Sequence, residues 1–124
     1  MAFPRIERGQ YKRPRVGDTC TTQVDNGDEM SVYFVVQEQV DDPAGLEKYM
    51  KAARASSLGR GRALVVDDDV CSIEGDWHGS RLVILEFDDE EAFRDWYDSP
   101  EYQAALPLRL ASTDSRGALA KGLS

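Results

Sequence analysis

The sequence predicts one α+β domain, an antiparallel sheet with its helices on one face. Two observations lead to this fold. Strand-like runs rich in β-branched and aromatic residues alternate with capped helical segments in the order β-α-β-β-α-β. Two of those runs, residues 32–40 and 81–87, are apolar on both alternating faces. The length of 124 residues is enough for about one hydrophobic core.

Residues 1–29 differ from the rest and are interpreted as an N-terminal extension, so the domain spans residues 30–124. Basic residues gather between Arg5 and Arg15, and turn formers without apolar periodicity come after them. The extension is interpreted as an appended arm or as the result of a misplaced translation start. An arm that packs on a partner subunit is the functional alternative.

The first strand and helix come next in the chain. The segment VYFVVQEQV at 32–40 has strand composition. Asp42 is the predicted N-cap of a helix, and Pro43 takes its first position, where the missing N–H group costs nothing. Gly59 or Gly61 ends this helix. The inner face of the helix recurs at helical spacing, at Leu46, Tyr49, Met50 and Ala53.

The middle of the chain predicts strands. RALVV at 62–66 and CSIEG at 71–75 are either two short strands or one strand interrupted by the acidic turn at 67–69. After Gly79, RLVILEF at 81–87 gives the clearest strand signal.

The last third predicts two helical segments and a final strand. Asp88 and Glu91 have the spacing of a capping box. Ser99 is the predicted N-cap of a second segment through Leu110, which Pro107 should bend or end. GALAKG then supplies a weak last strand. The buried stripe of the first segment is Phe93, Trp96 and Tyr97.

This order of elements is that of a ferredoxin-like sheet. Because its helices cover only one face, the second apolar face of the strands needs another cover. A second copy of the sheet is the simplest cover, so we expect a homodimer packed sheet against sheet.

Composition excludes several classes of protein. A formal net charge of -8 argues against nucleic acid or an anionic membrane as partner. Cys20 and Cys71 lie far apart without metal-ligand spacing, which indicates reduced thiols. No apolar run approaches the ~20 residues that span a bilayer, and the first residues lack a signal-peptide core. These features predict a cytoplasmic protein.

Four segments resemble a known family. EGDW, LEF and WYDSPEYQAALPLR, preceded by YFVVQEQVDDPAGLEKYM, are similar to the small bacterial proteins grouped as domain of unknown function 1330, over roughly residues 31–122. Gly59-Arg60-Gly61 departs from the Gly-Gly pair common in that family. The resemblance implies a dimeric α+β barrel. It implies no reaction, because that superfamily includes cofactor-free monooxygenases, lactone isomerases, haem enzymes and ligand sensors.

Two residues are candidates for proton transfer. His78 is the only histidine and lies beside Glu74 and Asp76, so it is a predicted general base. Its alternative role is that of an exposed loop residue. Glu74 is the second candidate, since Gly75 would allow a bulge that aims its carboxylate inward. Glu86 has a similar place at the end of a strand, but Glu74 is preferred because EGDW resembles the family motif. Ion pairing to an arginine explains either carboxylate equally well.

Candidate ligand contacts are Arg109, Tyr102, Tyr97 and Trp77. Arg109 offers a fixed fork of donors for a carboxylate or carbonyl group. The aromatic residues would line a pocket, with the tyrosine hydroxyls orienting the ligand. Core packing is the alternative for the aromatic residues, and pairing to Glu74 or Asp98 is the alternative for Arg109. No metal or cofactor site is predicted.

The sequence therefore predicts a homodimer that binds a small organic carbonyl or carboxylate compound. As an enzyme, it would carry out cofactor-independent proton transfer, as in isomerisation, cyclisation or hydrolytic opening. A non-catalytic ligand-binding or accessory module is the alternative, and a cofactor-free oxygenase is a third possibility.

Overall fold

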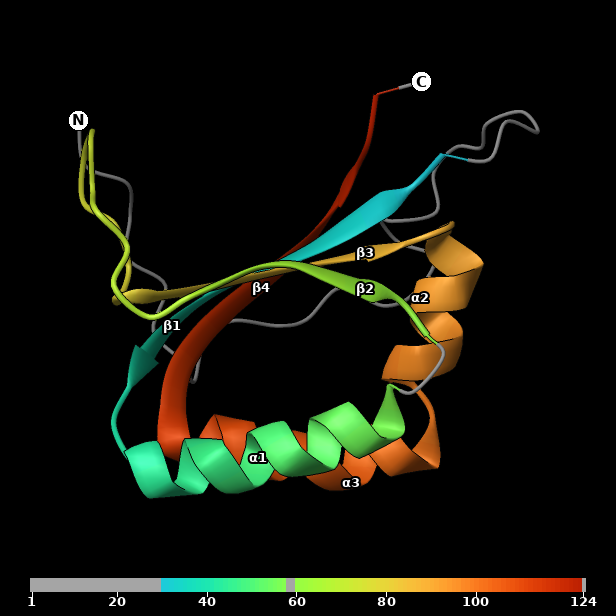
Figure 1. Ribbon diagram of the computed structural model, residues 1–124, viewed down its shortest axis with the longest axis horizontal. Helices are drawn as coiled ribbons and strands as arrows, with labels where there is room; N and C mark the ends of the chain where they lie inside the picture. The colour runs from blue at the N-terminus through green and yellow to red at the C-terminus, as the bar shows by residue number, and fades with distance from the viewer. Residues whose placement is uncertain (1–29, 58–59, 124) are drawn as a thin grey trace, which may run out of the picture.

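The computed structural model describes residues 30–57 and 60–123. The predicted N-terminal extension lies outside the described residues. The elements, in chain order, are β1 (Val32–Val40), α1 (Pro43–Ser56), β2 (Arg62–Asp67), β3 (Arg81–Phe87), α2 (Glu90–Tyr97), α3 (Pro100–Ser112) and β4 (Thr113–Lys121) (Figure 1).

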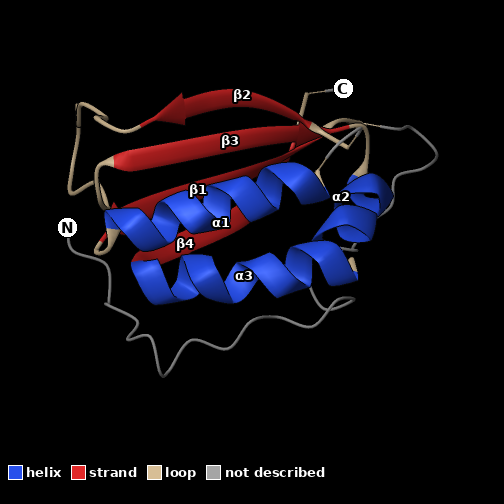
Figure 2. Ribbon diagram, turned by 60° about the horizontal axis from the view of Figure 1, so that its bottom comes forward, coloured by secondary structure: helices blue, strands red, loops and turns tan. Residues whose placement is uncertain are grey.

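The four strands form one antiparallel sheet in the order β2-β3-β1-β4. Helices α1 and α3 run side by side across one face of the sheet, and α2 lies at one end (Figure 2). This arrangement confirms the predicted α+β, ferredoxin-like fold.

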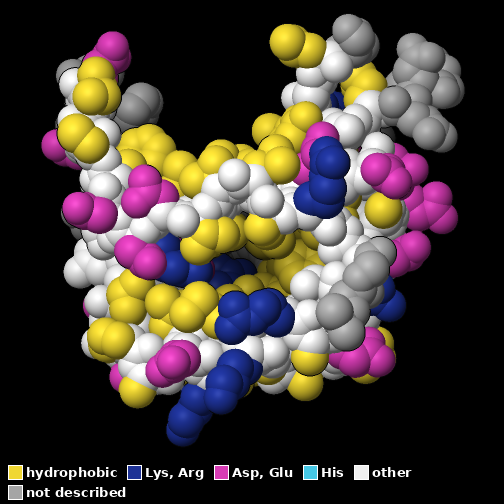
Figure 3. Space-filling model, viewed as in Figure 1, with side chains coloured by type: hydrophobic (Ala, Val, Ile, Leu, Met, Phe, Trp, Pro, Cys, Tyr) yellow, Lys and Arg dark blue, Asp and Glu magenta, His cyan; other side chains and the backbone are white. Residues whose placement is uncertain are grey.

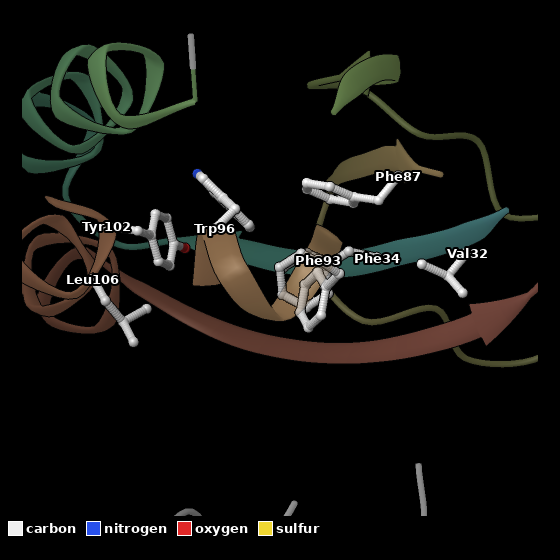
Figure 4. Close-up of a cluster of buried hydrophobic side chains, with 8 residues drawn as sticks. Val32, Phe34, Phe87, Phe93, Trp96, Tyr102 and Leu106 are labelled. Carbon is white, nitrogen blue, oxygen red and sulfur yellow. The ribbon is translucent and has the colours of Figure 1, made fainter. Parts of the chain in front are cut away.

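The alternation of strand residues explains which face is the core. Val32, Phe34 and Val36 point from β1 toward the helices, and all three are buried. Their β3 partners across the sheet, including Leu85 and Phe87, share that face. Aromatic rings from α2 and α3 complete the cluster (Figure 4). Packing of this apolar face against the helices is the main source of stability.

Helix starts agree with the predicted caps, with one correction. Helix α1 begins at Pro43 after Asp42, which has the N-cap position but makes no side-chain capping hydrogen bond. The Ser99 side chain caps α3 by accepting from the Tyr102 N–H group. The N-cap of α2 is Asp89, whose side chain accepts from the Ala92 N–H group, and not Asp88. Two consecutive aspartates permit two registers of the cap, and sequence spacing does not distinguish them.

Two predicted features of the chain path need correction. Pro107 does not end α3, which continues to Ser112. Pro107 is exposed, so water can bond the carbonyl group that proline leaves without a helical partner. CSIEG at 71–75 forms no strand. It belongs to the exposed loop between β2 and β3, where Gly75 has a φ of 71°.

The opposite face of the sheet carries a second set of apolar side chains. Val35 on β1 and Ile84 on β3 are directly paired and point away from the helices. In Figure 3 this side forms a concave saddle with hydrophobic side chains along its floor. The loop between β2 and β3 rises on the same side (Figure 1). None of the helices in residues 30–57 and 60–123 covers this face, and none is long and apolar enough to cross a membrane.

Candidate functional site

A cavity of about 280 Å³ lies between α1 and the helix-facing side of β1, β2 and β3. Figure 3 shows its mouth between β2 and α1, with arginine or lysine atoms at the floor and rim. Apolar side chains form most of the wall, among them Phe34, Val36, Val83, Leu85, Phe87 and Trp96. The volume is near the lower end of the range for small-molecule sites, ~300–1,000 Å³.

Three buried charged groups meet at one end of this cavity: Glu38, Arg81 and Arg109. Arg81 Nε donates to Glu38 Oε1 at 2.8 Å, and Arg109 Nη1 lies 3.8 Å from Glu38 Oε2. The side chains are only 3% exposed for Glu38 and 6% exposed for each arginine. Arg81 also pairs with Asp68 and donates to the Met50 sulfur at 3.3 Å. Two buried guanidinium groups therefore share one buried carboxylate.

The strands bring the first two charges together by register. Glu38 occupies the next helix-facing position after Val36 on β1, and Arg81 is its direct partner on β3. Sequence reasoning did not identify this pair as a site. The sequence does contain a signal for it. Every second residue on one face of each strand is apolar, and Glu38 and Arg81 are the charged residues that continue those two faces.

Arg109 reaches the cluster from α3. Its guanidinium carbon lies 5.8 Å from the centre of the Tyr49 ring, within cation-π range. Its Nε is buried and has no hydrogen-bond partner among the described residues. A buried donor without a partner is unfavourable in the free protein and available to a ligand oxygen.

Tyr49 and Tyr102 form a buried hydroxyl pair behind the charged cluster. Their oxygen atoms are 2.8 Å apart. Burial raises the pKa of both phenols, and for Tyr49 the neighbouring Tyr102 raises it further. Both hydroxyls therefore stay protonated at neutral pH. Tyr49 lines the cavity, whereas Tyr102 is fully buried one layer behind it.

The mouth of the cavity is also basic. Arg54 on α1, with Arg60 and Arg62 at the start of β2, line it and are exposed. Arg62 pairs with Glu86 and lowers the pKa of that carboxyl group. Glu86 lies on the side of the sheet away from the helices, where it also accepts from the Tyr33 hydroxyl at 3.1 Å.

Of the residues predicted to form the site, Arg109 lines the cavity. Tyr102 is buried behind the cavity, where its hydroxyl pairs with that of Tyr49 and its side chain also interacts with Arg109. Tyr97 packs among the core aromatics, with its ring stacked on Phe93 at 5.4 Å. Glu74 and Trp77 are exposed in the loop between β2 and β3 and do not line the cavity.

His78 also lies away from the cavity. Its Nε2 donates to the Asp114 carbonyl oxygen at 2.7 Å, because a carbonyl group only accepts. This contact ties the end of the long loop to the start of β4. The structure therefore does not bring His78 and Glu74 together with Arg109 in one cavity.

No three His, Cys, Asp or Glu side chains within residues 30–57 and 60–123 come close enough to hold a metal ion. Cys71 is an exposed thiol in the loop between β2 and β3.

Solved structures of several proteins share this fold. A protein of unknown function from Rhodopseudomonas palustris is 17% identical, with a TM-score of 0.68 over 78% of this chain and 85% of its own. A dimeric ferredoxin-like protein of unknown function from Thermobifida fusca is 17% identical, with a TM-score of 0.57 over 81% of this chain and 100% of its own.

A third similar structure has a described activity. SnoaB, a cofactor-independent oxygenase from Streptomyces nogalater, is 21% identical, with a TM-score of 0.56 over 77% of this chain and 95% of its own. At this identity the likeness establishes a common fold and no common reaction. No curated protein matches the sequence.

The sequence itself identifies the family. Residues 31–123 match the domain of unknown function DUF1330, which covers all of the sheet and helices described above. The chain therefore belongs to the DUF1330 family.

Proposed function

We propose that this protein binds a small organic anion in the cavity between α1 and the sheet. The observation that carries the proposal is the charge at its inner end, where Arg81 and Arg109 are both buried with Glu38 as the one carboxylate buried between them. A buried charge without full compensation is costly. Arg81 has Asp68 as a second carboxylate partner, whereas among the described residues Arg109 has only Glu38, at 3.8 Å. A ligand carboxylate or enolate oxygen gives Arg109 a second counter-charge and its Nε a hydrogen-bond partner.

The rest of the cavity favours a compact apolar body on that anion. Its wall is mostly aliphatic and aromatic, with Phe87 and Trp96 stacked 5.3 Å apart at the end far from Arg81. Apolar walls exclude water and so strengthen the attraction between the guanidinium groups and a bound anion. The substrate class supported best is a small carboxylate that also bears a carbonyl group.

For such a ligand, the reaction supported is cofactor-independent proton transfer. The Glu38 carboxylate takes a proton from the carbon beside the carbonyl group, and the electrons of that C–H bond form an enolate. Arg81 and Arg109 stabilise the enolate oxygen, with the protonated Tyr49 hydroxyl nearby as a donor. Return of the proton to another carbon gives an isomer. Glu38 thus takes the role predicted for His78 and Glu74.

The fold of SnoaB gives the oxygenase alternative some support, since an enolate is also the species that could react with dioxygen. A non-catalytic ligand-binding module uses the same charges without the proton step. Both alternatives keep the anion site and differ only in the chemistry of the bound ligand.

The partner in this proposal is a second copy of the chain, packed through the saddle that carries Val35 and Ile84. Support comes from the apolar side chains of that face, which no described helix covers, and from the Thermobifida fusca protein, which has this fold and is dimeric.

Binding is tested by calorimetric titration with benzoate and with benzamide, its neutral counterpart of similar shape. We expect benzoate to bind at least ten times more tightly, and Arg109→Lys, which keeps the charge but loses the fork, to weaken benzoate about tenfold. Arg94→Lys is the matched control, because Arg94 pairs with Glu90 on α2 outside the cavity. Equal binding of benzoate and benzamide would refute the anion site.

Proton transfer is tested with levulinate, which has both a carboxylate and a ketone. Incubation in heavy water should exchange its hydrogens beside the ketone for deuterium, as measured by proton NMR. Glu38→Gln should abolish the exchange, whereas His78→Gln and Glu74→Gln should not. Binding without exchange would leave the non-catalytic module as the function.

A further inference from the structure

The cavity has a second cluster of positive charge, at its mouth. Arg54 projects from the last turn of α1, and Arg60 precedes β2 on the opposite rim. Both are exposed, and neither forms an ion pair with any residue in 30–57 or 60–123. The third rim arginine, Arg62, is neutralised in part by Glu86.

The lining of the cavity is therefore opposite in charge to the molecule as a whole. Its charged residues are five arginines and one glutamate, and Asp68 and Glu86 pair with only two of these arginines. The whole chain carries a formal net charge of -8. A basic hollow in an acidic protein concentrates its field at the opening and attracts anions there, while the surrounding surface repels them.

The two basic clusters lie at different places along the sheet. Arg81 begins β3, and Arg62 is paired with Glu86 near the end of that strand, five residues further on. At ~3.4 Å per residue, about 17 Å of strand separates the backbone of Arg81 from that of Glu86. Because an arginine side chain is long and flexible, its guanidinium group can bind a carboxylate well away from the level of its own backbone. Between Arg81 and Glu86 the helix-facing side of β3 presents Val83 and Leu85, both apolar.

From this arrangement we infer that the ligand of the cavity is an elongated dicarboxylate. One carboxylate pairs with Arg81 and Arg109 at the buried end, the apolar chain lies along Val83 and Leu85, and the second carboxylate meets Arg54 and Arg60 at the mouth. The inference rests on the proposed anion site and deepens it by specifying two charges at a fixed separation. The rim cations select for the second charge, and they exclude ligands that end in an amine.

The test compares α,ω-dicarboxylates from succinate to suberate with the monocarboxylates of equal chain length, butyrate to octanoate, by calorimetric titration of the full chain. We expect one dicarboxylate length to bind at least ten times more tightly than its monocarboxylate counterpart. Arg54→Gln and Arg60→Gln should each reduce that advantage severalfold, because the loss of the second carboxylate contact weakens the dicarboxylate more than the loss of one positive charge weakens the monocarboxylate. Lys48→Gln is the control, because Lys48 is an exposed cation on α1 that does not line the cavity.

The outcomes separate the two claims. If monocarboxylates bind and dicarboxylates bind no better at any length, the dicarboxylate inference is overturned and the buried anion site stands. If a dicarboxylate advantage persists in both rim variants, the inference is likewise overturned, since the second charge is then held elsewhere. If neither series binds to folded protein, the anion site itself fails.

Discussion

Glu38 on β1 and Arg81 on β3 are direct partners in the sheet and form a buried ion pair, with Arg81 Nε 2.8 Å from Glu38 Oε1. Arg109 lies against the other oxygen of the same carboxylate. The exposed Asp68 is a second partner of Arg81 alone, and Glu38 is therefore the one buried carboxylate between two buried guanidinium groups. Removing that carboxylate should cost far more stability than removing a surface partner.

Glu38→Gln should lower the free energy of unfolding by about 3–5 kcal/mol, because it leaves the buried Arg109 without its counter-charge and Arg81 with only the exposed Asp68. Glu90→Gln is the control. It breaks the pair with Arg94 along one face of α2 and should cost about 0.3–0.5 kcal/mol. Urea denaturation monitored by circular dichroism measures both changes. A cost for Glu38→Gln no larger than that for Glu90→Gln would contradict the buried pair.

Gly79 supports the same region through its backbone. Its φ is 74°, and an added Cβ would lie 2.1 Å from the Glu38 carbonyl oxygen. Gly75 in the same loop has a φ of 71°, but an added Cβ there would meet nothing within 4 Å. Gly75→Ala should therefore cost about 1–2 kcal/mol from the left-handed backbone alone.

Gly79→Ala should lower the free energy of unfolding by about 1–3 kcal/mol more than Gly75→Ala does, because that is the usual penalty for extra atoms in a packed site. Thermal unfolding of both variants gives the comparison. Similar melting temperatures for the two variants would show that the loop does not approach β1 as closely as described.

The paired tyrosines predict a loss of stability at alkaline pH. Burial raises the pKa of Tyr49 and Tyr102 in the folded protein above the ordinary value near 10. Below about pH 10 the phenols are protonated in both states, and their contribution is fully present. Above it the unfolded chain ionises first, so stability falls as pH rises.

Tyr102→Phe should make the fall in stability with rising pH less steep between about pH 9.5 and 11. At pH 7 the same variant should lose about 1–3 kcal/mol of stability, because it removes the partner of the buried Tyr49 hydroxyl. Tyr33→Phe gives the comparison on the opposite face of the sheet, where the hydrogen bond to Glu86 also raises the pKa of the phenol. Because Tyr33 is not in the buried pair, this variant should flatten the fall less than Tyr102→Phe. Urea denaturation across the pH series gives the slopes. If the free energy of unfolding of Tyr102→Phe falls with pH as steeply as that of the natural chain, the Tyr49–Tyr102 pair is not the source of the alkaline loss of stability.

The sheet face opposite the helices predicts the oligomeric state. Ile84 lies at its centre, paired with Val35. Sedimentation should give the mass of a dimer for the natural chain and of a monomer for Ile84→Glu, since a charge at the centre of the interface prevents the two sheets from packing. Leu110→Glu on an exposed position of α3 should remain dimeric. A natural chain that stays monomeric at micromolar concentration would overturn the dimer.

Much of the fold was predictable because its signals are local. The strand composition of 81–87 and the Ser99 cap each depend on a few neighbouring residues. The errors came where local signals compete. Two aspartates offered two caps, and an apolar pair within CSIEG resembled a strand, although the structure places that segment in a loop outside the ladder.

The site was harder to predict, because long-range register assembles it. Glu38 and Arg81 are 43 positions apart, and Arg109 comes from a third element. His78 and Trp77 are conspicuous in the sequence, yet they lie in the loop away from the cavity. A charged residue at an apolar strand position is the stronger indicator, because the sheet then buries it among groups that must compensate its charge.

The central claim is that Arg81 and Arg109 bind an anion together, and NMR of the arginine side-chain Nε–H groups tests it most directly. On titration with benzoate, the Nε–H signal of Arg109 should shift furthest, because that donor has no partner among the described residues, and the Arg81 signal should shift with the same dissociation constant. Arg94, paired with Glu90 on α2, should not respond. Saturating benzoate that moves neither the Arg109 nor the Arg81 signal would contradict the account.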